Sequence, residues 1–231
     1  MRGEAVDIFE DLQQKLITAQ LKSEAKLKPA ELQDQYGCSA NTVREALLRL
    51  STVGLVTFRN QRGFRVASIS TERRKDVARF RIMLEQEGAV LSMRFGGVAW
   101  ESRVSAAHHK LKHIETQLER EGPIETLMAL WSSAEVEFHE TLISACDSEL
   151  MRTTYANVYV QFRQQFVGLE PNFTPKYFAE IIGEHQAILD AALSRDADAC
   201  RVAIEAHLVR YLHDGRAQAK SLQPAGMSSS R

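Results

Sequence analysis

Apolar residues recur at helical spacing along most of the chain, and a strand-like pattern appears only once. A first helix is predicted over residues 5–20, where Ile8 and Leu12 begin an apolar face. A second helix is expected in PAELQDQYG, with Pro29 in its first turn and Gly37 at its end. The chain therefore opens with two helices joined by a short polar break.

A third helix and a hairpin follow directly. In CSANTVREALLRL, Ser39 is a natural N-cap and apolar residues return every three or four positions, up to an end near residues 51–54. Two β-prone runs, Leu55–Arg59 and Phe64–Ala67, then flank the polar, glycine-containing segment NQRG, which indicates a hairpin. Three helices and a hairpin predict one small domain over residues 1–68.

The remainder of the chain shows helical periodicity only. Short breaks rich in Gly, Pro, Ser and Asp separate the segments, and such an arrangement predicts an all-α antiparallel bundle over residues 69–220. The tail, residues 221–231, has no periodicity, and we expect it to be disordered. Six helices are expected in the bundle, over residues 71–95, 100–121, 124–145, 148–168, 175–194 and 197–218.

Composition narrows the class of protein but decides little about function. The 231 residues are 44% hydrophobic and 26% charged, as in ordinary soluble globular proteins. No apolar run is long enough to span a membrane, and the acidic N-terminus is unlike a signal peptide. Three scattered cysteines favour a reducing cytoplasm. Residues 1–68 hold ten Lys/Arg against eight Asp/Glu, and the rest holds nineteen against twenty-two, a weak signal for nucleic acid.

The start of the third helix has the chemistry of a DNA-reading surface. A short helix, a turn and a second helix form a helix-turn-helix, whose second helix enters the major groove by its first residues. Small and polar residues there allow close approach, and arginine can bind phosphate or guanine. A generic three-helix subdomain with a polar surface is the alternative. The candidate DNA contacts are Ser39, Asn41, Thr42, Arg44 and Arg49 on the helix, and Asn60, Arg62 and Gly63 in the hairpin tip.

The run ELQDQYGCSANTVREALLRLSTVGLVTFRNQRGFRV resembles the winged-helix domain of GntR-family transcription regulators. The matching features are EL-x5-G, the cap Ser39, VREAL, GLV and RGFRV. The resemblance implies a homodimer that binds a palindromic double-stranded operator. Three departures stand out: Ala40 and Ala30 replace arginines common in relatives, and Ala19 stands in place of the usual glycine. The operator contacts of relatives therefore do not transfer to this chain.

In the second domain, four polar residues lie on stripes predicted to be buried. Glu135 and His139 are four residues apart on one helix, and His185 and His207 each lie between apolar residues on later helices. One carboxylate and three imidazoles suit Zn²⁺, Ni²⁺, Mn²⁺ or Fe²⁺. The alternative is a set of core histidines without metal. His108, His109, His113 and His213 are expected to face solvent.

The second domain resembles the FCD effector-binding domain of the FadR subfamily. The metal-binding version of this domain has an acidic residue four positions before a His, matched here by Glu135 and His139. A second His follows in an E-H-x2-I-L motif, matched by His185, and a third lies 22 residues after it, matched by His207. Aspartate is usual where Glu135 stands. The family's Arg-x2-Leu-Glu motif matches Arg81–Glu85, which implies that Arg81 binds an acidic effector; the alternative is a surface ion pair between Arg81 and Glu85.

These features together predict a metabolite-responsive DNA-binding regulator, with repression as the expected sign. A small organic acid is expected to bind at a divalent transition metal in the helical bundle and to change operator affinity. One alternative is a metal-dependent hydrolase or oxygenase with an accessory DNA-binding domain, although no separate general base is evident. A regulator with a metal-free effector domain is the other alternative.

Overall fold

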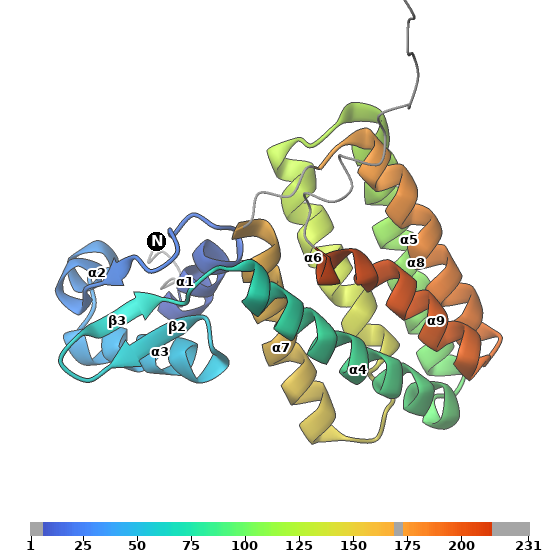
Figure 1. Cartoon of the computed structure of the whole chain (residues 1–231), viewed down its shortest axis with the longest axis horizontal. Coiled ribbons are helices and arrows are strands. Elements are labelled where there is room, and N and C mark those ends of the chain that lie inside the picture. Colours follow the sequence, from blue (N-terminus) through green and yellow to red (C-terminus); the bar gives the residue numbers. More distant parts are fainter. Residues whose placement is uncertain (1–6, 169–172, 214–231) are drawn as a thin grey trace, which may run out of the picture.

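The computed structural model describes residues 7–168 and 173–213. Figure 1 shows a small domain of helices and a sheet at one end and a larger helical bundle at the other. Each part has its own hydrophobic cluster, one built around Leu47 and Leu50 and the other around Trp131 and Phe138. This confirms the predicted class, a winged helix followed by an all-α bundle.

Helices of the small domain begin and end where the sequence places caps. The side chain of Ser39 accepts a hydrogen bond from the Thr42 backbone N–H at 3.1 Å, which starts the third helix. Gly54 ends that helix with a φ of 88°, a conformation that favours glycine. The three helices are α1 (Ile8–Ile17), α2 (Pro29–Tyr36) and α3 (Ala40–Val53).

The wing is a three-stranded antiparallel sheet rather than a two-stranded hairpin. Strands β2 (Val56–Arg59) and β3 (Gly63–Val66) pair as predicted, with Phe58 opposite Phe64. A strand that the sequence pattern did not reveal, β1 (Lys26–Leu27), pairs with the other side of β3. Two residues are too short for a period of two to be visible, so only the structure shows this strand.

The six predicted helices of the bundle all form. They are α4 (Thr71–Phe95), α5 (Val98–Glu121), α6 (Glu125–Leu142), α7 (Glu149–Gly168), α8 (Pro175–Leu193) and α9 (Ala197–Leu208).

The prediction for the last helix is wrong after residue 208. The chain continues as a 3-10 turn, η1 (Val209–Leu212), and His213 is extended. Tyr211 still packs into the core from this turn, so the helical spacing of its apolar residues is satisfied without an α-helix. Residues 214–218 of the predicted helix and the predicted disordered tail lie outside the described residues.

Packing in the bundle places α5 between α6 and α8, and α4 between α7 and α9 (Figure 1). Large side chains fill the space between them, including Trp100, Trp131 and Phe138, each almost fully buried. Among the described helices, none has an apolar stretch long enough to cross a lipid bilayer. The cysteines at positions 38, 146 and 200 are free thiols.

Helix α7 joins the bundle to the small domain. Its Gln164 donates a hydrogen bond to the Leu55 carbonyl at 3.2 Å, and Gln165 donates to the Ser68 carbonyl at 2.9 Å. Gln161 lies so close to Gly54 that a Cβ there would come within 2.9 Å of it. The small domain is therefore held by specific polar contacts to one helix of the bundle.

Candidate functional site

The first turn of α3 is open to solvent. Asn41, Thr42 and Arg44 are all exposed there, as expected for a surface that approaches a base edge. Ser39 is occupied as the helix cap, and its hydroxyl also lies 2.8 Å from that of Thr42. The hydroxyl of Ser39 therefore stabilises the helix start, whereas the side chains of Asn41 and Arg44 are available to contact DNA.

Arg44 and Arg49 lie against different neighbours. The guanidinium carbon of Arg44 is 5.8 Å from the centre of the Phe58 ring, so Arg44 lies between the helix and the wing. The guanidinium carbon of Arg49 is 4.1 Å from the centre of the Phe9 ring on α1. A DNA contact by Arg49 would have to be made with its guanidinium stacked on α1.

Strand β1 adds one cation, Lys26, to the wing, and the sequence patterns did not reveal it. Lys26 on β1 lies opposite Arg65 on β3, and like charges placed opposite each other repel. Arg59 and Arg62 are exposed nearby, at the end of the hairpin that also holds Asn60 and Gly63. Within residues 7–168 and 173–213, none of these four cations has an ion pair, and they line a depression of about 570 Å³ with Glu24 as its acidic member. This surface suits an anionic backbone.

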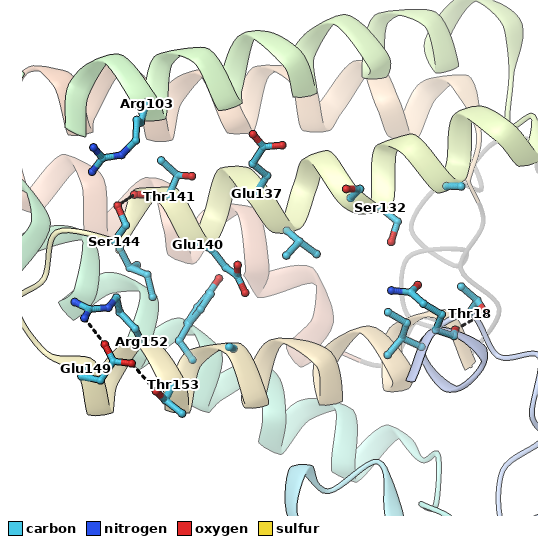
Figure 2. A pocket seen from close by; sticks show the side chains of 18 residues that line it. Thr18, Arg103, Ser132, Glu137, Glu140, Thr141, Ser144, Glu149, Arg152 and Thr153 are labelled. Atoms are coloured by element: carbon cyan, nitrogen blue, oxygen red, sulfur yellow. Dashed lines mark hydrogen bonds and ion pairs between the residues drawn. The ribbon is translucent and has the colours of Figure 1, made fainter. Parts of the chain in front are cut away.

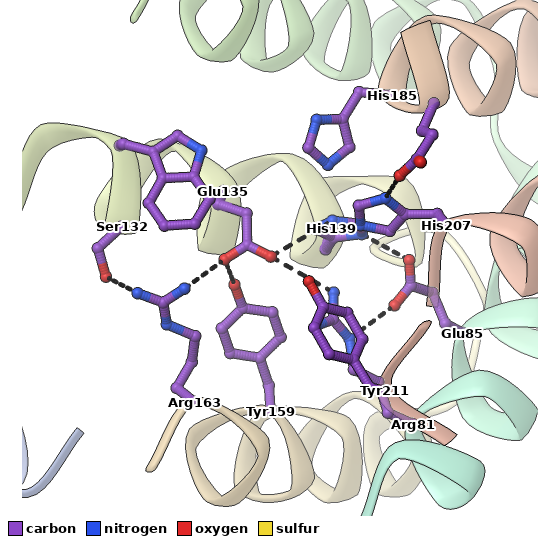
Figure 3. A network of polar contacts seen from close by, with 12 residues as sticks. Arg81, Glu85, Ser132, Glu135, His139, Tyr159, Arg163, His185, His207 and Tyr211 are labelled. Carbon is purple, nitrogen blue, oxygen red and sulfur yellow. Dashed lines mark hydrogen bonds and ion pairs between the residues drawn. The ribbon is translucent and has the colours of Figure 1, made fainter. Parts of the chain in front are cut away.

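The bundle interior brings together the three predicted histidines. His139 on α6, His185 on α8 and His207 on α9 are buried, and one ligand nitrogen of each lies within 4.8 Å of the others. Figure 3 shows the three rings meeting from separate helices. Neutral imidazoles gathered in this way are a donor set for a divalent transition metal.

A carboxylate lies behind each imidazole ring, on a different helix in every case. The Nδ1 atoms of His139, His185 and His207 lie 2.5, 2.9 and 2.8 Å from carboxylate oxygens. Hydrogen bonds to Glu85 and Glu184 orient the rings of His139 and His207. Nε2 of His139 and both ring nitrogens of His185 are buried with no hydrogen-bond partner in the described chain, which leaves them for a metal. The residues therefore fit a metal. The three acids are Glu85 on α4, Glu115 on α5 and Glu184 on α8.

The ring environments differ in their effect on protonation. Burial lowers the pKa of His139, and burial together with the neighbouring histidines lowers the pKa of His207 well below its usual range. Burial lowers the pKa of His185 as well, but the nearby Glu115 carboxylate outweighs burial, so the pKa of His185 is raised. Two of the three rings are thus held neutral, the form that binds a metal.

Glu135 lies beside the histidine group but is held from the other side. Its carboxylate accepts hydrogen bonds from the Tyr159 hydroxyl at 2.5 Å and from Arg163 at 3.1 Å. Its other oxygen lies 3.8 Å from Nε2 of His139, just outside the three-histidine group. Burial raises the pKa of Glu135, but Arg163 and Arg81 outweigh this and lower it. A role as fourth metal ligand stays a prediction.

Arg81 and Glu85 form a pair that is fully buried, so the alternative of a surface ion pair is wrong. Arg81 Nε donates to Glu85 at 3.1 Å, and both side chains are 0% exposed. Contacts with His139 and Arg81 overcome burial and lower the pKa of Glu85 to about 2. Both terminal nitrogens of Arg81 have no hydrogen-bond partner among the described residues, and the nearer is 3.7 Å from Glu135. Such a buried, unsatisfied guanidinium is able to bind a carboxylate.

The remaining histidines mostly follow the prediction. His109, His113 and His213 are exposed, but His108 is only 4% exposed, so its predicted solvent-facing position is wrong. Helix α5 packs against both α6 and α8, so its buried face is wider than a single apolar stripe. The ring of His108 packs edge-on against Phe138, at 5.6 Å between ring centres.

A groove of about 800 Å³ runs between α6 and α7 and reaches α1 of the small domain (Figure 2). Its walls carry charges of both signs, including Arg103, Glu140 and Arg152. Tyr155 forms part of its inner wall, and the Tyr155 hydroxyl donates to Glu85 at 2.7 Å. Tyr155 thus contacts both this groove and the buried polar network.

Comparison with known proteins assigns both parts of the chain. Residues 4–66 match the family described as bacterial regulatory proteins, gntR family, and residues 76–210 match the FCD domain. The chain belongs to the GntR family. It is a transcription regulator with a helix-turn-helix DNA-binding domain and an FCD domain, and not an enzyme, so the hydrolase or oxygenase alternative is excluded.

Relatives cover most of this GntR-family chain. A Paraburkholderia xenovorans protein named uncharacterized HTH-type transcriptional regulator BphR is 33% identical over 87% of this chain and 80% of its own. The Escherichia coli HTH-type transcriptional repressor GlaR is 26% identical over 89% of this chain and 92% of its own. Escherichia coli McbR/YncC shares the fold with a TM-score of 0.72 at 20% identity, over 91% of this chain and 95% of that chain.

Proposed function

We propose that this regulator represses transcription by binding a palindromic operator as a homodimer, and that a small carboxylate bound at a metal in the FCD domain controls that binding. The observation that supports it most directly is the meeting of three imidazole nitrogens and an unsatisfied Arg81 in one buried network. The relative GlaR, which is similar over most of its length, is named a transcriptional repressor. The cytoplasm is the proposed location.

The DNA contacts are proposed to come from two surfaces of the small domain. Asn41 and Arg44 approach base edges in the major groove, where a good bidentate contact contributes about 1–3 kcal/mol of discrimination. The wing cations Lys26, Arg59 and Arg65 bind phosphates without reading sequence. Two-fold symmetry of the homodimer would match the symmetry of the operator.

The metal is proposed to be held by His139, His185 and His207, with Glu135 as the fourth ligand. A divalent ion there supplies a positive charge that attracts a carboxylate and leaves a position open for it. Tyr159 and Arg163 both bond Oε2 of Glu135, so Oε1, 3.8 Å from Nε2 of His139, is the oxygen proposed to bind the metal. Arg81 would bind the same effector carboxylate from the other side.

Helix α7 is the proposed link between effector and operator. One face carries Tyr159 and Arg163, which hold Glu135 beside the histidines. Another face carries Gln164 and Gln165, which hold the small domain through backbone carbonyls. An effector that shifts Glu135 would therefore move a helix that also positions the DNA-reading domain. Couplings of this kind are typically about 1–3 kcal/mol.

A metal-free effector domain remains the second candidate. The observation in its favour is that Nδ1 of His139 and Nδ1 of His207 already bond Glu85 and Glu184, at 2.5 and 2.8 Å, so part of the network is satisfied without an ion. Metal analysis of the full chain after purification without chelators separates the two. About one equivalent of Zn, Ni, Mn or Fe per chain supports the metal site. Absence of metal, together with no uptake of Zn²⁺ on dialysis, would contradict it.

Operator binding is tested by affinity selection of fragmented genomic DNA on the purified full chain. We expect a short palindrome to be enriched, and Arg44→Ala to abolish its enrichment. Glu45→Ala, on the same exposed helix, is the matched control and should retain it. Adding pooled organic acids to the metal-loaded protein should change the enrichment. Equal enrichment for the unaltered chain and Arg44→Ala would contradict the proposed reading surface.

A further inference from the structure

The buried network has few charged members, and their charges do not balance. Five charged side chains are buried in the described chain, and all of them surround the histidines. Two guanidiniums oppose three carboxylates, which leaves one negative charge once all three imidazoles are neutral, as metal binding requires. Glu184 and Arg210, which lie further out and are less buried, form an ion pair whose charges sum to zero. The five are Arg81, Arg163, Glu85, Glu115 and Glu135.

Other titratable groups nearby do not alter this balance. The hydroxyl groups of Tyr155 and Tyr159 donate hydrogen bonds to Glu85 and Glu135, so both phenols are neutral. Burial raises the pKa of Cys200 to about 11, so this thiol is neutral as well. A divalent cation added to the network therefore leaves one positive charge. A single carboxylate would then make the buried network neutral, the arrangement that burial of charges favours.

The unpaired hydrogen-bond donors of the network also indicate that one carboxylate binds there. Arg81 has two unpaired terminal nitrogens, enough to bind one carboxylate through two hydrogen bonds. Arg163 uses both terminal nitrogens on Glu135 and Ser132, and only its Nε is unpaired. The rings of Tyr159 and Phe162 lie over Arg81, each with its centre 4.6 Å from the guanidinium carbon. A second carboxylate would therefore be buried among aromatic rings without a guanidinium that could bind it through two hydrogen bonds.

We infer that the effector of this regulator carries one carboxylate and no second negative charge. The inference rests on the proposed function and narrows it to monocarboxylates. The preference for monocarboxylates has two causes. One added negative charge makes the metal-loaded network neutral, and the free nitrogens of Arg81 suffice to bind one carboxylate but not two. Glu115 contributes to the preference, since its negative charge offsets half of that of the divalent ion.

The test compares matched acids on the full chain saturated with Zn²⁺, by titration calorimetry. The panel pairs straight-chain monocarboxylates of three to six carbons with the corresponding dicarboxylates, each with and without a 2-hydroxyl group. The monocarboxylate of the best-binding pair should bind at least about tenfold more tightly than its partner. Equal or tighter binding of the dicarboxylate would overturn the inference while the proposed function stood. Binding of neither class would overturn both.

Charge as the cause is tested by Glu115→Gln, which removes one buried negative charge at nearly constant shape. At saturating Zn²⁺ its preference should shift by at least about tenfold toward dicarboxylates, because the site then completes two negative charges. Glu115→Asp keeps the charge and should keep the original preference. Glu137→Gln is the control, since Glu137 is exposed on α6 and pairs with Lys110. An unchanged preference in Glu115→Gln would overturn the charge argument.

Discussion

The two domains of this regulator place their charges in opposite ways. In the small domain the buried side chains of the described residues are all apolar, and its cations lie on the surface. Among the described residues of the FCD domain, five charged side chains and four histidines are buried. Burying charges costs more than burying hydrocarbon, so an interior of this kind is weak evidence for stability and stronger evidence for a binding role. The first domain exposes its charged side chains, whereas the second buries a group of them at its centre.

The largest effect is expected from breaking the charge network. Glu85→Ala leaves Arg81 buried without its partner and removes the acceptor of Tyr155 and His139, so we expect a loss of about 3–5 kcal/mol in the free energy of unfolding. Urea denaturation of metal-free protein measures it. Glu87→Ala on the same helix removes an exposed pair with Arg201 and should cost less than about 1 kcal/mol. Equal losses for the two variants would contradict the distinction.

Removing an apolar side chain from the core of the small domain should affect DNA binding but not metal binding. Leu47 is 0% exposed in the core of that domain, so Leu47→Ala is expected to cost roughly 2–5 kcal/mol there. Operator binding should fall, while the metal content of the FCD domain stays unchanged. Leu48→Ala, on the exposed side of the same helix, is the control. Loss of metal in Leu47→Ala would show that the two cores are not separable.

Acid should weaken the protein through a buried histidine of the FCD domain. Burial lowers the pKa of His108 from 6.5 to about 4. Between these values the unfolded chain binds the extra proton, so stability rises with pH, by at most about 1.4 kcal/mol per unit. Below pH 4 both states are protonated, and above 6.5 both are neutral. Neighbours that also act on His108 are His185, Lys112, Asp190 and His109.

Chemical denaturation of metal-free protein across this pH range measures the slope. In His108→Gln the slope should decrease, whereas the exposed His109→Gln should keep that of the unaltered chain. A slope that is the same in His108→Gln and in the unaltered chain would contradict the assignment.

The smallest expected effect concerns the surface of the wing. Arg65→Gln and Lys26→Gln should each lower the slope of operator affinity against salt by about one unit, with little change in sequence preference. Fluorescence anisotropy at several salt concentrations measures it. Lys22→Gln, outside the sheet, should leave the slope unchanged. A changed preferred sequence would indicate that these cations contact bases instead.

Much of the fold was predictable because local signals agreed with the packing. The bounds of α4 match the prediction, since Ser70 caps its start and Gly96 and Gly97 follow its end. The histidine group was also predictable, because each ring lies within an apolar stripe. The carboxylates behind the rings were missed, since Glu85, Glu115 and Glu184 resemble the glutamates common on helix surfaces.

The misses have physical causes as well. A face that packs against two helices is wider than an i, i+3, i+4 stripe, and His108 occupies the added width. The pairing of β1 with β3 is a long-range contact that no local pattern contains. Position in space, rather than spacing in sequence, decides both cases.

Central to this account is the coupling between the buried site and the operator. The direct measurement is operator affinity of the full chain at constant salt, with and without a saturating monocarboxylate, in metal-loaded and metal-stripped protein. We predict a change of about 5–150-fold in the metal-loaded protein and none in the metal-stripped protein. The same affinity in all four conditions would contradict the account.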